Sequence, residues 1–456
     1  MNASAKLLAG IAFCGAALFT TTAAAREWKD RSGKFSIEAE LAGIEGDSVR
    51  LKKPDGQTVL VPLSRLCEKD RQFVKSQDSG GDKAKSQEAP PAAKKTTAAS
   101  GNSNKQTEAP LRHPAKVYRL GSGRPATGTA VAGMEGLDEA IDSFMSEIGA
   151  KAATLAVADN GRLLFCRGYG YADKEERQPT QPEHIMRIAS CSKPFTAALV
   201  KGLLRAGKLR PDLRVFPYLA IRPREGSTAD ARLQSITVSQ LLEHKGGFDR
   251  EQSFDPMFAM KKIETALKLE GPPSARDVVE YMMTQPLQFN PGERTAYSNF
   301  GYCVLGRVVE KATGASYVEA VQRGISRPLG IRDLILSRTK ASERDPREVW
   351  YPVADDEFRV EVMDAHGGLA TSVASLCRFM QSYWIGGDPR GPMPQQFHYN
   401  FFGSLPGTTA LIKQREDGIH YAVLLNNRRN AQFQQDNERL EKSLDAAIDA
   451  IKMRLR

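Results

Sequence analysis

Cysteines, which can cross-link a chain or bind zinc, are scarce in this sequence. It holds six cysteines, of which five remain if the first 25 residues are removed, and these five lie far apart. An odd number of cysteines at wide spacing predicts neither a disulfide framework nor a zinc site. We therefore expect no metal and no cofactor, and we expect the cysteines to pack as small apolar side chains.

Long apolar runs and blocks of like charge are scarce too. The apolar run at residues 7–19 follows Lys6 and precedes Ala23-Ala24-Ala25, a pattern typical of a signal peptide over residues 1–25. The run is too short to span a membrane, and no other segment reaches that length. The net charge of +10 is spread along the chain without a basic block that interleaves aromatics. We expect an exported protein, periplasmic or extracellular, that has no transmembrane segment when mature and binds no nucleic acid.

Composition divides the remaining chain into three parts. Residues 26–77 alternate apolar and polar side chains in three expected strands, carry the hairpin signal Pro54-Asp55-Gly56, and end in a short helix expected from Ser64 to Val74. Residues 78–116 are rich in Ser, Gly, Ala, Pro and Lys, which predicts a linker. Residues 117–456 have ample apolar content for a large domain.

The large domain begins and ends with similar elements. A helix over residues 137–148 and a hairpin of strands 153–158 and 162–167 are expected at its start. Strands 408–414 and 421–425 and a helix over 437–453 are expected at its end, with helices between. This order predicts an α+β fold, an antiparallel sheet flanked by helices with an all-helical subdomain. We expect the active site where the sheet and the helical part meet.

One short motif carries a nucleophile. Lys193 follows Ser190 by three residues, and residues three apart on a helix share a face with their Cβ atoms about 5–6 Å apart. An apolar helical pattern follows, so Ser190 is expected at a helix N-terminus, where backbone N–H groups favour negative charge. Cys191 points about a quarter-turn away and is expected to pack.

A second motif, Tyr297-Ser298-Asn299, follows a Pro-Gly turn and precedes another apolar helix. A Ser-x-x-Lys with a distant Tyr-x-Asn is typical of serine acyl transfer that uses lysine and tyrosine as bases. We expect Lys193 and Tyr297 to share the proton of Ser190, and Asn299 to orient the lysine and the substrate. The alternative for Tyr297 is a half-buried core residue. A second Ser-x-x-Lys, Ser337 to Lys340, lies in a polar stretch and is expected on the surface.

The two motifs resemble those of the family of serine β-lactamases, penicillin-binding proteins and related esterases, closest to its class C branch. The resemblance covers roughly residues 130–430 and rests on the matching segments Gly168–Asp173, Arg187–Ala197, Leu241–His244, Tyr297–Tyr302 and Gly367–Ser372. It implies the β-lactamase/transpeptidase-like fold and an acyl-enzyme formed on Ser190 from a small-molecule acyl substrate.

The segment that should carry the third motif of this family departs from the pattern. Relatives have Lys-Thr-Gly or His-x-Gly on an edge strand, and this chain has Phe401-Phe402-Gly403 before Ser404. We expect Gly403 to allow close approach to substrate, the three residues to contact it, and the N–H groups of Ser190 and Ser404 to form the oxyanion hole.

The missing cation at Phe401 has consequences for substrate choice. It predicts a preference for short neutral esters over β-lactams and D-alanyl peptides, with Arg428 and Arg429 as candidates for a compensating charge. His366-Gly367-Gly368 is an alternative third motif, although a helical pattern follows it. The alternative function is a catalytically degenerate cell-envelope binding protein on the same scaffold.

The small N-terminal unit resembles another family. Trp28, the segment Ser32–Phe35 and the hairpin Leu51–Gly56 are similar to the SH3-like first homology domain of SLA-type endocytic adaptors. The resemblance implies a small SH3-like β-barrel that binds short peptides. A peptide or envelope partner is therefore expected, and a spacer is the alternative.

Overall fold

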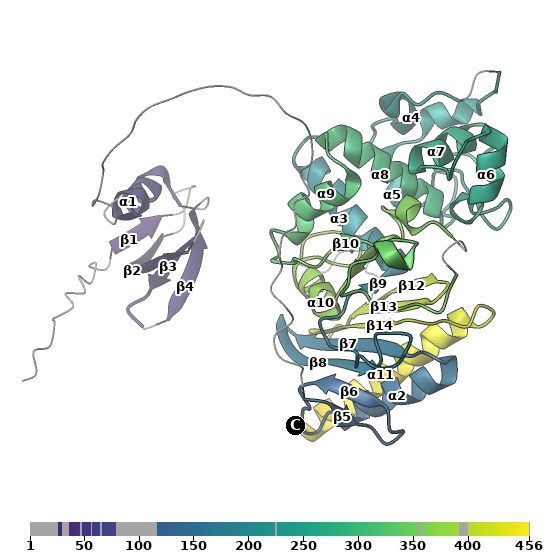
Figure 1. Cartoon of the computed structure of the whole chain (residues 1–456). Helices are drawn as coiled ribbons and strands as arrows, with labels where there is room; N and C mark the ends of the chain where they lie inside the picture. The colour runs from purple at the N-terminus through teal and green to yellow at the C-terminus, as the bar shows by residue number, and fades with distance from the viewer. Residues whose placement is uncertain are drawn as a thin grey trace, which may run out of the picture. The chain divides into compact units, whose positions relative to one another are not determined.

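The structure, a computed structural model, describes residues 26–29, 36–45, 48–55, 57–63, 66–78, 116–223, 226–354, 358–391 and 400–455. The chain divides into two compact units, residues 1–106 and 107–456 (Figure 1). The expected signal peptide, nearly all of the expected linker and the segment Ser32–Phe35 lie outside the described residues. The expected domain boundaries therefore stay predictions.

The first unit is an antiparallel sheet with one helix. Its strands pair in sequence order: β1 Arg26–Lys29, β2 Ser36–Glu45, β3 Ser48–Lys52 and β4 Thr58–Pro62. Helix α1, Glu68–Asp78, begins later than expected, with Glu68 and Asp70 in its first turn, where carboxylates are favourable. Trp28 is buried and packs edge-on against Phe73. Within the described part of this unit, no pairing closes the sheet into the expected barrel.

The second unit is built around an antiparallel sheet, as the sequence predicts, and this sheet has seven strands. The order across the sheet is β12-β13-β14-β7-β8-β6-β5. The bounds are β5 Tyr118–Arg119, β6 Pro125–Gly128, β7 Ala152–Asp159, β8 Arg162–Gly170, β12 Asn400–Leu405, β13 Thr408–Gln414 and β14 Ile419–Leu425. Strand β14 pairs with β7 along its whole length, so segments far apart in the sequence form the middle of the sheet.

Both faces of this sheet are buried. On β7, Leu155 and Val157 face a core shared with α2 (Glu135–Ile148) and α11 (Phe433–Leu455), which lie together on one side (Figure 1). Ala156 and Ala158 alternate with them and face the larger core on the other side. Their small side chains let α10 (Val373–Ser382) pack closely on that face.

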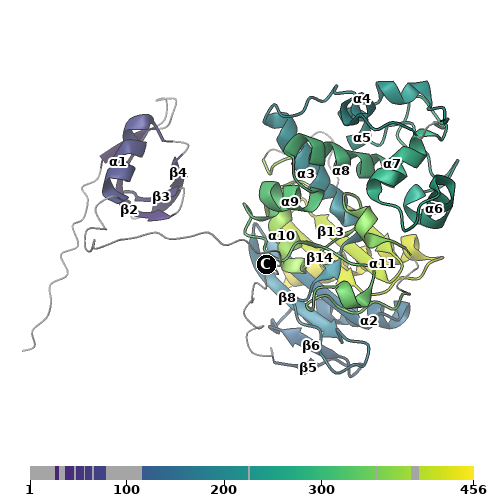
Figure 2. The ribbon, with the colours of Figure 1, turned by 45° about the horizontal axis from the view of Figure 1, so that its top comes forward.

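Helices dominate the middle of the chain and gather beyond that face (Figure 2). Their bounds are α3 Ser192–Arg205, α4 Val215–Leu219, α5 Val238–Leu242, α6 Met260–Leu267, α7 Ala275–Met283, α8 Asn299–Thr313 and α9 Tyr317–Val321. A small sheet of β10 (Ile335–Leu336), β11 (Leu369–Thr371) and β9 (Met186–Arg187) joins them to the large sheet's core. The two expected catalytic motifs lie at the starts of α3 and α8.

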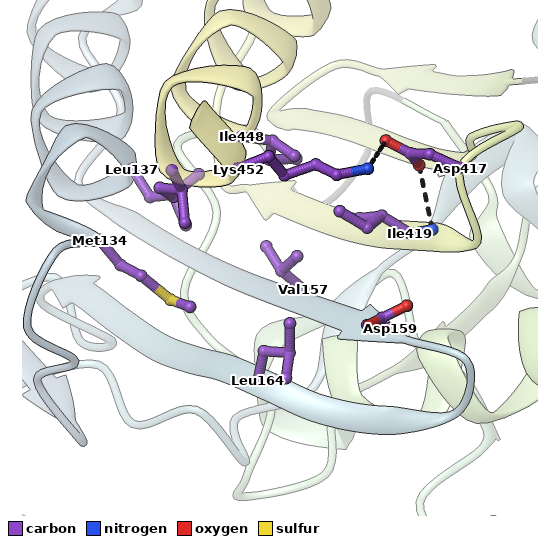
Figure 3. A pocket seen from close by; sticks show the side chains of 10 residues that line it. Met134, Leu137, Val157, Asp159, Leu164, Asp417, Ile419, Ile448 and Lys452 are labelled. Carbon is purple, nitrogen blue, oxygen red and sulfur yellow. Dashed lines mark hydrogen bonds and ion pairs between the residues drawn. The ribbon is translucent and has the colours of Figure 1, made fainter. Parts of the chain in front are cut away.

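An apolar pocket of about 230 Å³ lies away from both motifs, where α2 and α11 cover the sheet (Figure 3). Val157, Ile419 and Ile448 line it, and Lys452 forms an ion pair with Asp417 over 2.8 Å at its side. None of the expected catalytic residues contributes to this pocket. Across the described ranges, no helix combines the length and apolar character needed to cross a membrane.

Candidate active site

Ser190 lies in a 3₁₀ turn, Ala189–Cys191, that leads directly into α3. The residue before it, Ala189, has a φ of 45° in the left-handed region, where an L-residue is disfavoured by about 1–2 kcal/mol. The turn carries the Ser190 side chain into a cavity of about 420 Å³. As expected, Cys191 is turned away and fully buried, and burial raises the pKa of its thiol.

The two motifs converge on the Ser190 hydroxyl. Lys193 Nζ lies 3.2 Å from Ser190 Oγ, and the Tyr297 hydroxyl donates to Ser190 Oγ over 2.9 Å. The lysine comes from the first turn of α3 and the tyrosine from the segment that precedes α8. The geometry therefore places one nucleophile between two side chains that can exchange protons with it.

Lys193 is held by three acceptors. Besides Ser190 Oγ, its ammonium donates to Asn299 Oδ1 over 2.7 Å and to the His366 carbonyl over 2.8 Å. The side chain is buried, and this burial lowers the pKa of Lys193 to about 7. A substantial neutral fraction at neutral pH lets the lysine accept a proton from Ser190.

Tyr297 has the opposite tendency. Burial raises its pKa, so its hydroxyl stays protonated and acts as a donor. His244 fixes its ring from one side: the two ring centroids lie 4.7 Å apart, and His244 Nδ1 accepts a hydrogen bond from the Ser298 N–H over 3.1 Å. The sequence contained a signal for this contact, because the segment Leu241–His244 matches the family pattern.

Gly403 brings the strand β12 next to the nucleophile. A Cβ at this position would lie 2.3 Å from the Ile188 carbonyl oxygen and 3.2 Å from the Ala189 Cβ. Only a glycine allows that approach without a backbone shift. Ser404, the next residue, lines the cavity together with Ser190. The assignment of their two N–H groups to the oxyanion hole stays a prediction.

Phe401 and Phe402 lie on opposite faces of β12, because successive side chains along a strand point to opposite sides. Phe402 and Ser404 line the cavity, whereas Phe401 packs against the larger core. The Cys191 thiol donates to the Phe401 carbonyl over 3.4 Å. Neither Phe401 nor Gly403 is among the described residues that line the cavity, so their expected contacts with substrate stay predictions. His366 precedes β11, on a different element from Gly403, so the alternative third motif does not occupy this strand position.

Arginines provide the positive charge that β12 lacks. Arg428 lines the cavity and donates from Nη1 to Ser404 Oγ over 3.0 Å. Arg250 also lines the cavity, with its guanidinium carbon 5.1 Å from the centre of the Tyr297 ring. Arg429 instead pairs with Asp436 and Glu147. No aspartate or glutamate is among the described residues that line this cavity. Sequence reasoning named Arg428 but missed Arg250, whose loop carries no motif.

The second Ser-x-x-Lys motif lies only partly on the surface: Lys340 is exposed as expected, whereas its serine is not. Ser337 is fully buried, donates to Glu348 Oε1 over 2.6 Å and accepts from Arg187 Nε over 3.0 Å. Arg187 and Glu348 form a buried ion pair that needs such additional partners. Ser337 therefore serves as a hydrogen-bond partner of this pair, whose Arg187 lies three residues before Ser190.

Comparisons with known proteins agree with this geometry. The family described as "Beta-lactamase" matches residues 137–438, and "SLA1 homology domain 1" matches residues 19–80. Esterase EstB of Burkholderia gladioli is 32% identical over 203 residues, which are 43% of this chain and 50% of that protein. The mitochondrial serine β-lactamase-like protein LACTB of Mus musculus is 25% identical over 349 residues, 59% of this chain and 61% of that protein.

Solved structures show the same fold. The D-amino acid amidase from Ochrobactrum anthropi superposes with a TM-score of 0.55 at 19% identity, covering 71% of this chain and 99% of that chain. The chain spans about half to three-fifths of the length of the two curated relatives above. Because the family match extends over more than half of the 456 residues, the chain belongs to the β-lactamase family of serine hydrolases.

Proposed function

We propose that this protein is an active serine hydrolase that forms an acyl-enzyme on Ser190 and hydrolyses small esters or amides. The observation that carries the proposal is the position of Ser190 Oγ, 3.2 Å from Lys193 Nζ and 2.9 Å from the Tyr297 hydroxyl. Both contacts are within reach for proton transfer in the transition state. The family membership supports the same reaction class.

The reaction follows from the protonation states of the two side chains. Neutral Lys193 takes the proton of Ser190 as Oγ attacks the carbonyl carbon of the substrate, and the N–H groups of Ser190 and Ser404 receive the developing oxyanion. As the tetrahedral intermediate collapses, Tyr297 donates a proton to the leaving oxygen or nitrogen and is reprotonated from Lys193. Water then attacks the acyl-enzyme with Lys193 as base, which releases the acid and restores Ser190.

Esters are the proposed preferred substrates. A relative that is 32% identical is an esterase, which supports this choice. The sequence-based reason, the absence of a cation near Phe401, is weakened by Arg428 and Arg250, which both line the cavity. A carboxylate in the substrate would meet partners there instead of being desolvated alone. The ester preference therefore needs a direct comparison between substrates with and without a carboxylate.

We also propose that the protein is exported and that the N-terminal unit binds a peptide or envelope component or serves as a spacer. The N-terminal sequence pattern supports export, and the match to SLA1 homology domain 1 supports a binding module. Cell fractionation with mass spectrometry of the mature N-terminus tests export: a chain that keeps residues 1–25 in the cytoplasm would contradict it.

The test of the hydrolase proposal is covalent labelling. The purified protein should react with a serine-directed fluorophosphonate, gain one probe mass and lose ester hydrolysis, and Ser190→Ala should do neither. A folded wild-type protein that is not labelled and does not hydrolyse p-nitrophenyl esters would favour the degenerate binding protein instead. The matched control is Ser337→Ala, which removes the other Ser-x-x-Lys serine.

A further inference from the structure

The Asn299 side chain bridges Lys193 and a carboxylate that no motif predicted. Its Oδ1 accepts from Lys193 Nζ over 2.7 Å, and its Nδ2 donates to Asp255 Oδ2 over 2.6 Å. An ammonium only donates hydrogen bonds and an ionised carboxylate only accepts them. The amide therefore has one orientation that satisfies both partners. Asp255 still requires this orientation when Lys193 is neutral, because a neutral amine can also accept a hydrogen bond.

Asp255 is itself held in place. Its Oδ1 accepts from the Met257 N–H over 3.1 Å, at the start of the 3₁₀ turn Pro256–Phe258. Its Oδ2 lies 3.7 Å from Arg250 Nη1, and the side chain is only 14% exposed. A carboxylate in this position can fix a neighbouring amide because it cannot rotate away without losing both contacts.

We propose that Asp255 is a positioning residue for the acyl-transfer reaction: it holds the Asn299 amide with its oxygen toward Lys193, and its negative charge, opposed by that of Arg250, acts on Lys193 across this amide. The proposal rests on the proposed function, because it assigns Asp255 a part in the same site. It extends the catalytic group by a residue from the helical part of the molecule.

Among the residues that the structure describes, Asp255 and Arg250 are the charged side chains that act on Lys193. The other groups that face it are neutral: the Ser190 hydroxyl, the Cys191 thiol, the rings of Tyr297 and Tyr302, the Asn299 amide, and the carbonyl of His366. Burial lowers the pKa of the His366 imidazole far below its usual range, so this ring stays uncharged. Burial is the main cause that lowers the pKa of Lys193; Asp255 raises that pKa and Arg250 lowers it.

The test is the dependence of kcat/KM on pH for p-nitrophenyl butyrate. Lys193 must be neutral to act as base, so kcat/KM rises with pH as the lysine loses its proton. We call this rising part of the profile, on its acidic side, the acid limb. Asp255→Asn keeps the shape of the side chain and removes its charge. Because the charged lysine loses its stabilising neighbour, the acid limb should move down by about one pH unit, and the plateau should fall because Asn299 can now turn its amide. Arg250→Gln should move the limb in the opposite direction.

The matched control is Asp249→Asn in the same loop. The Asp249 carboxylate accepts hydrogen bonds from Arg294 over 2.7 Å and from the Glu251 N–H over 3.0 Å. Neither of these bonds involves Asn299 or Lys193. Its removal takes the same charge from the loop and should leave the acid limb where the wild type has it. Circular dichroism and melting temperatures establish that each variant is folded.

The outcomes separate this proposal from the proposed function. An active wild type whose acid limb is unchanged in both Asp255→Asn and Arg250→Gln overturns the role of Asp255 and leaves the hydrolase assignment standing. If Asp255→Asn does not fold, Arg250→Gln alone is decisive. An acid limb of the pH profile that stays where the wild type has it would then overturn the proposal that the charges of Asp255 and Arg250 act on Lys193. A wild type that neither hydrolyses esters nor takes the fluorophosphonate overturns both.

Discussion

Arg428 donates from Nη1 to the Ser404 hydroxyl over 3.0 Å, across the width of one intervening strand. Ser404 is paired with Thr409, and Thr409 with Leu425, three residues before Arg428. The register of β12, β13 and β14 thus places the residues just after β14 level with Ser404, so the Arg428 guanidinium reaches the edge strand β12. One of the two arginines that line the cavity thus follows β14, on the other side of β13 from the edge strand β12.

This arrangement predicts how substrates are selected. The ester preference, which the esterase relative supports, predicts a higher kcat/KM for p-nitrophenyl butyrate than for nitrocefin, which carries a carboxylate. Arg428 acts in the opposite direction, because it offers a partner to a carboxylate in the cavity. Arg428→Gln should lower kcat/KM for an ester that carries a carboxylate by about 10–100-fold, because a charge-assisted hydrogen bond contributes about 1.5–3 kcal/mol. The neutral ester should be nearly unaffected. Arg429→Gln is the control, since Arg429 pairs with Asp436. Equal losses for both esters in Arg428→Gln would contradict the prediction.

The two Ser-x-x-Lys serines should behave differently when each is replaced. Ser190→Ala should abolish fluorophosphonate labelling and ester hydrolysis and leave the melting temperature nearly unchanged. Ser337→Ala should still be labelled but should unfold more easily, by about 1–3 kcal/mol, because the buried Arg187–Glu348 pair loses a hydrogen-bond partner. Labelling combined with urea unfolding measures both effects. The reverse pattern would mean that Ser337 is the nucleophile.

The two proton-transferring side chains should have distinct pH signatures. With a pKa of about 7, Lys193 becomes neutral as the pH rises through 7, so kcat/KM should increase between about pH 6 and 8. Tyr297→Phe should lower the rate on the order of 10²–10⁴-fold while keeping that limb, because Tyr297 stays protonated over this range. Stopped-flow pH profiles of both proteins provide the measurement. A wild-type profile that is flat from pH 6 to 8 rules out Lys193 as the base.

Gly403→Ala tests the close approach of β12 to the nucleophile. The added methyl group would collide with the Ile188 carbonyl, so β12 must move and the Ser404 N–H moves with it. We expect kcat to fall about 10²–10³-fold, the usual effect of losing one oxyanion donor. Gly121→Ala is the matched control, because a Cβ there meets no atom within 4 Å. Full activity in Gly403→Ala would show that Ser404 does not donate to the oxyanion.

The sequence predicted the regular elements well because their apolar residues recur with a clear period. Strand β13 has the predicted bounds, and α11 begins four residues earlier and ends two residues later than predicted. The convergence of Ser190, Lys193, Tyr297 and Asn299 was predicted from the two motifs. Local pattern was sufficient there because each motif lies at the start of a helix.

Contacts made by loops could not be predicted in this way. Asp255 and Arg250 lie in a segment without helical or strand periodicity, and their positions depend on how the helical part folds back over the site. The bond from Lys193 to the His366 carbonyl involves a backbone atom, for which the residue type carries no signal. The burial of Ser337 was missed because a polar stretch is usually exposed, and a buried ion pair reverses that rule.

The pairing of β14 with β7 also determines when the protein can become functional during its synthesis. When residue 300 emerges from the ribosome, the nascent chain already contains Ser190, Lys193 and Tyr297. Strand β14, which pairs with β7 over residues 153–159, has not yet been synthesised. The edge strand beside the nucleophile and Arg428 follow only after residue 400. Long-range pairing of this kind forms late. A chain cut short between residue 300 and β14 would carry every catalytic side chain and still have no assembled site.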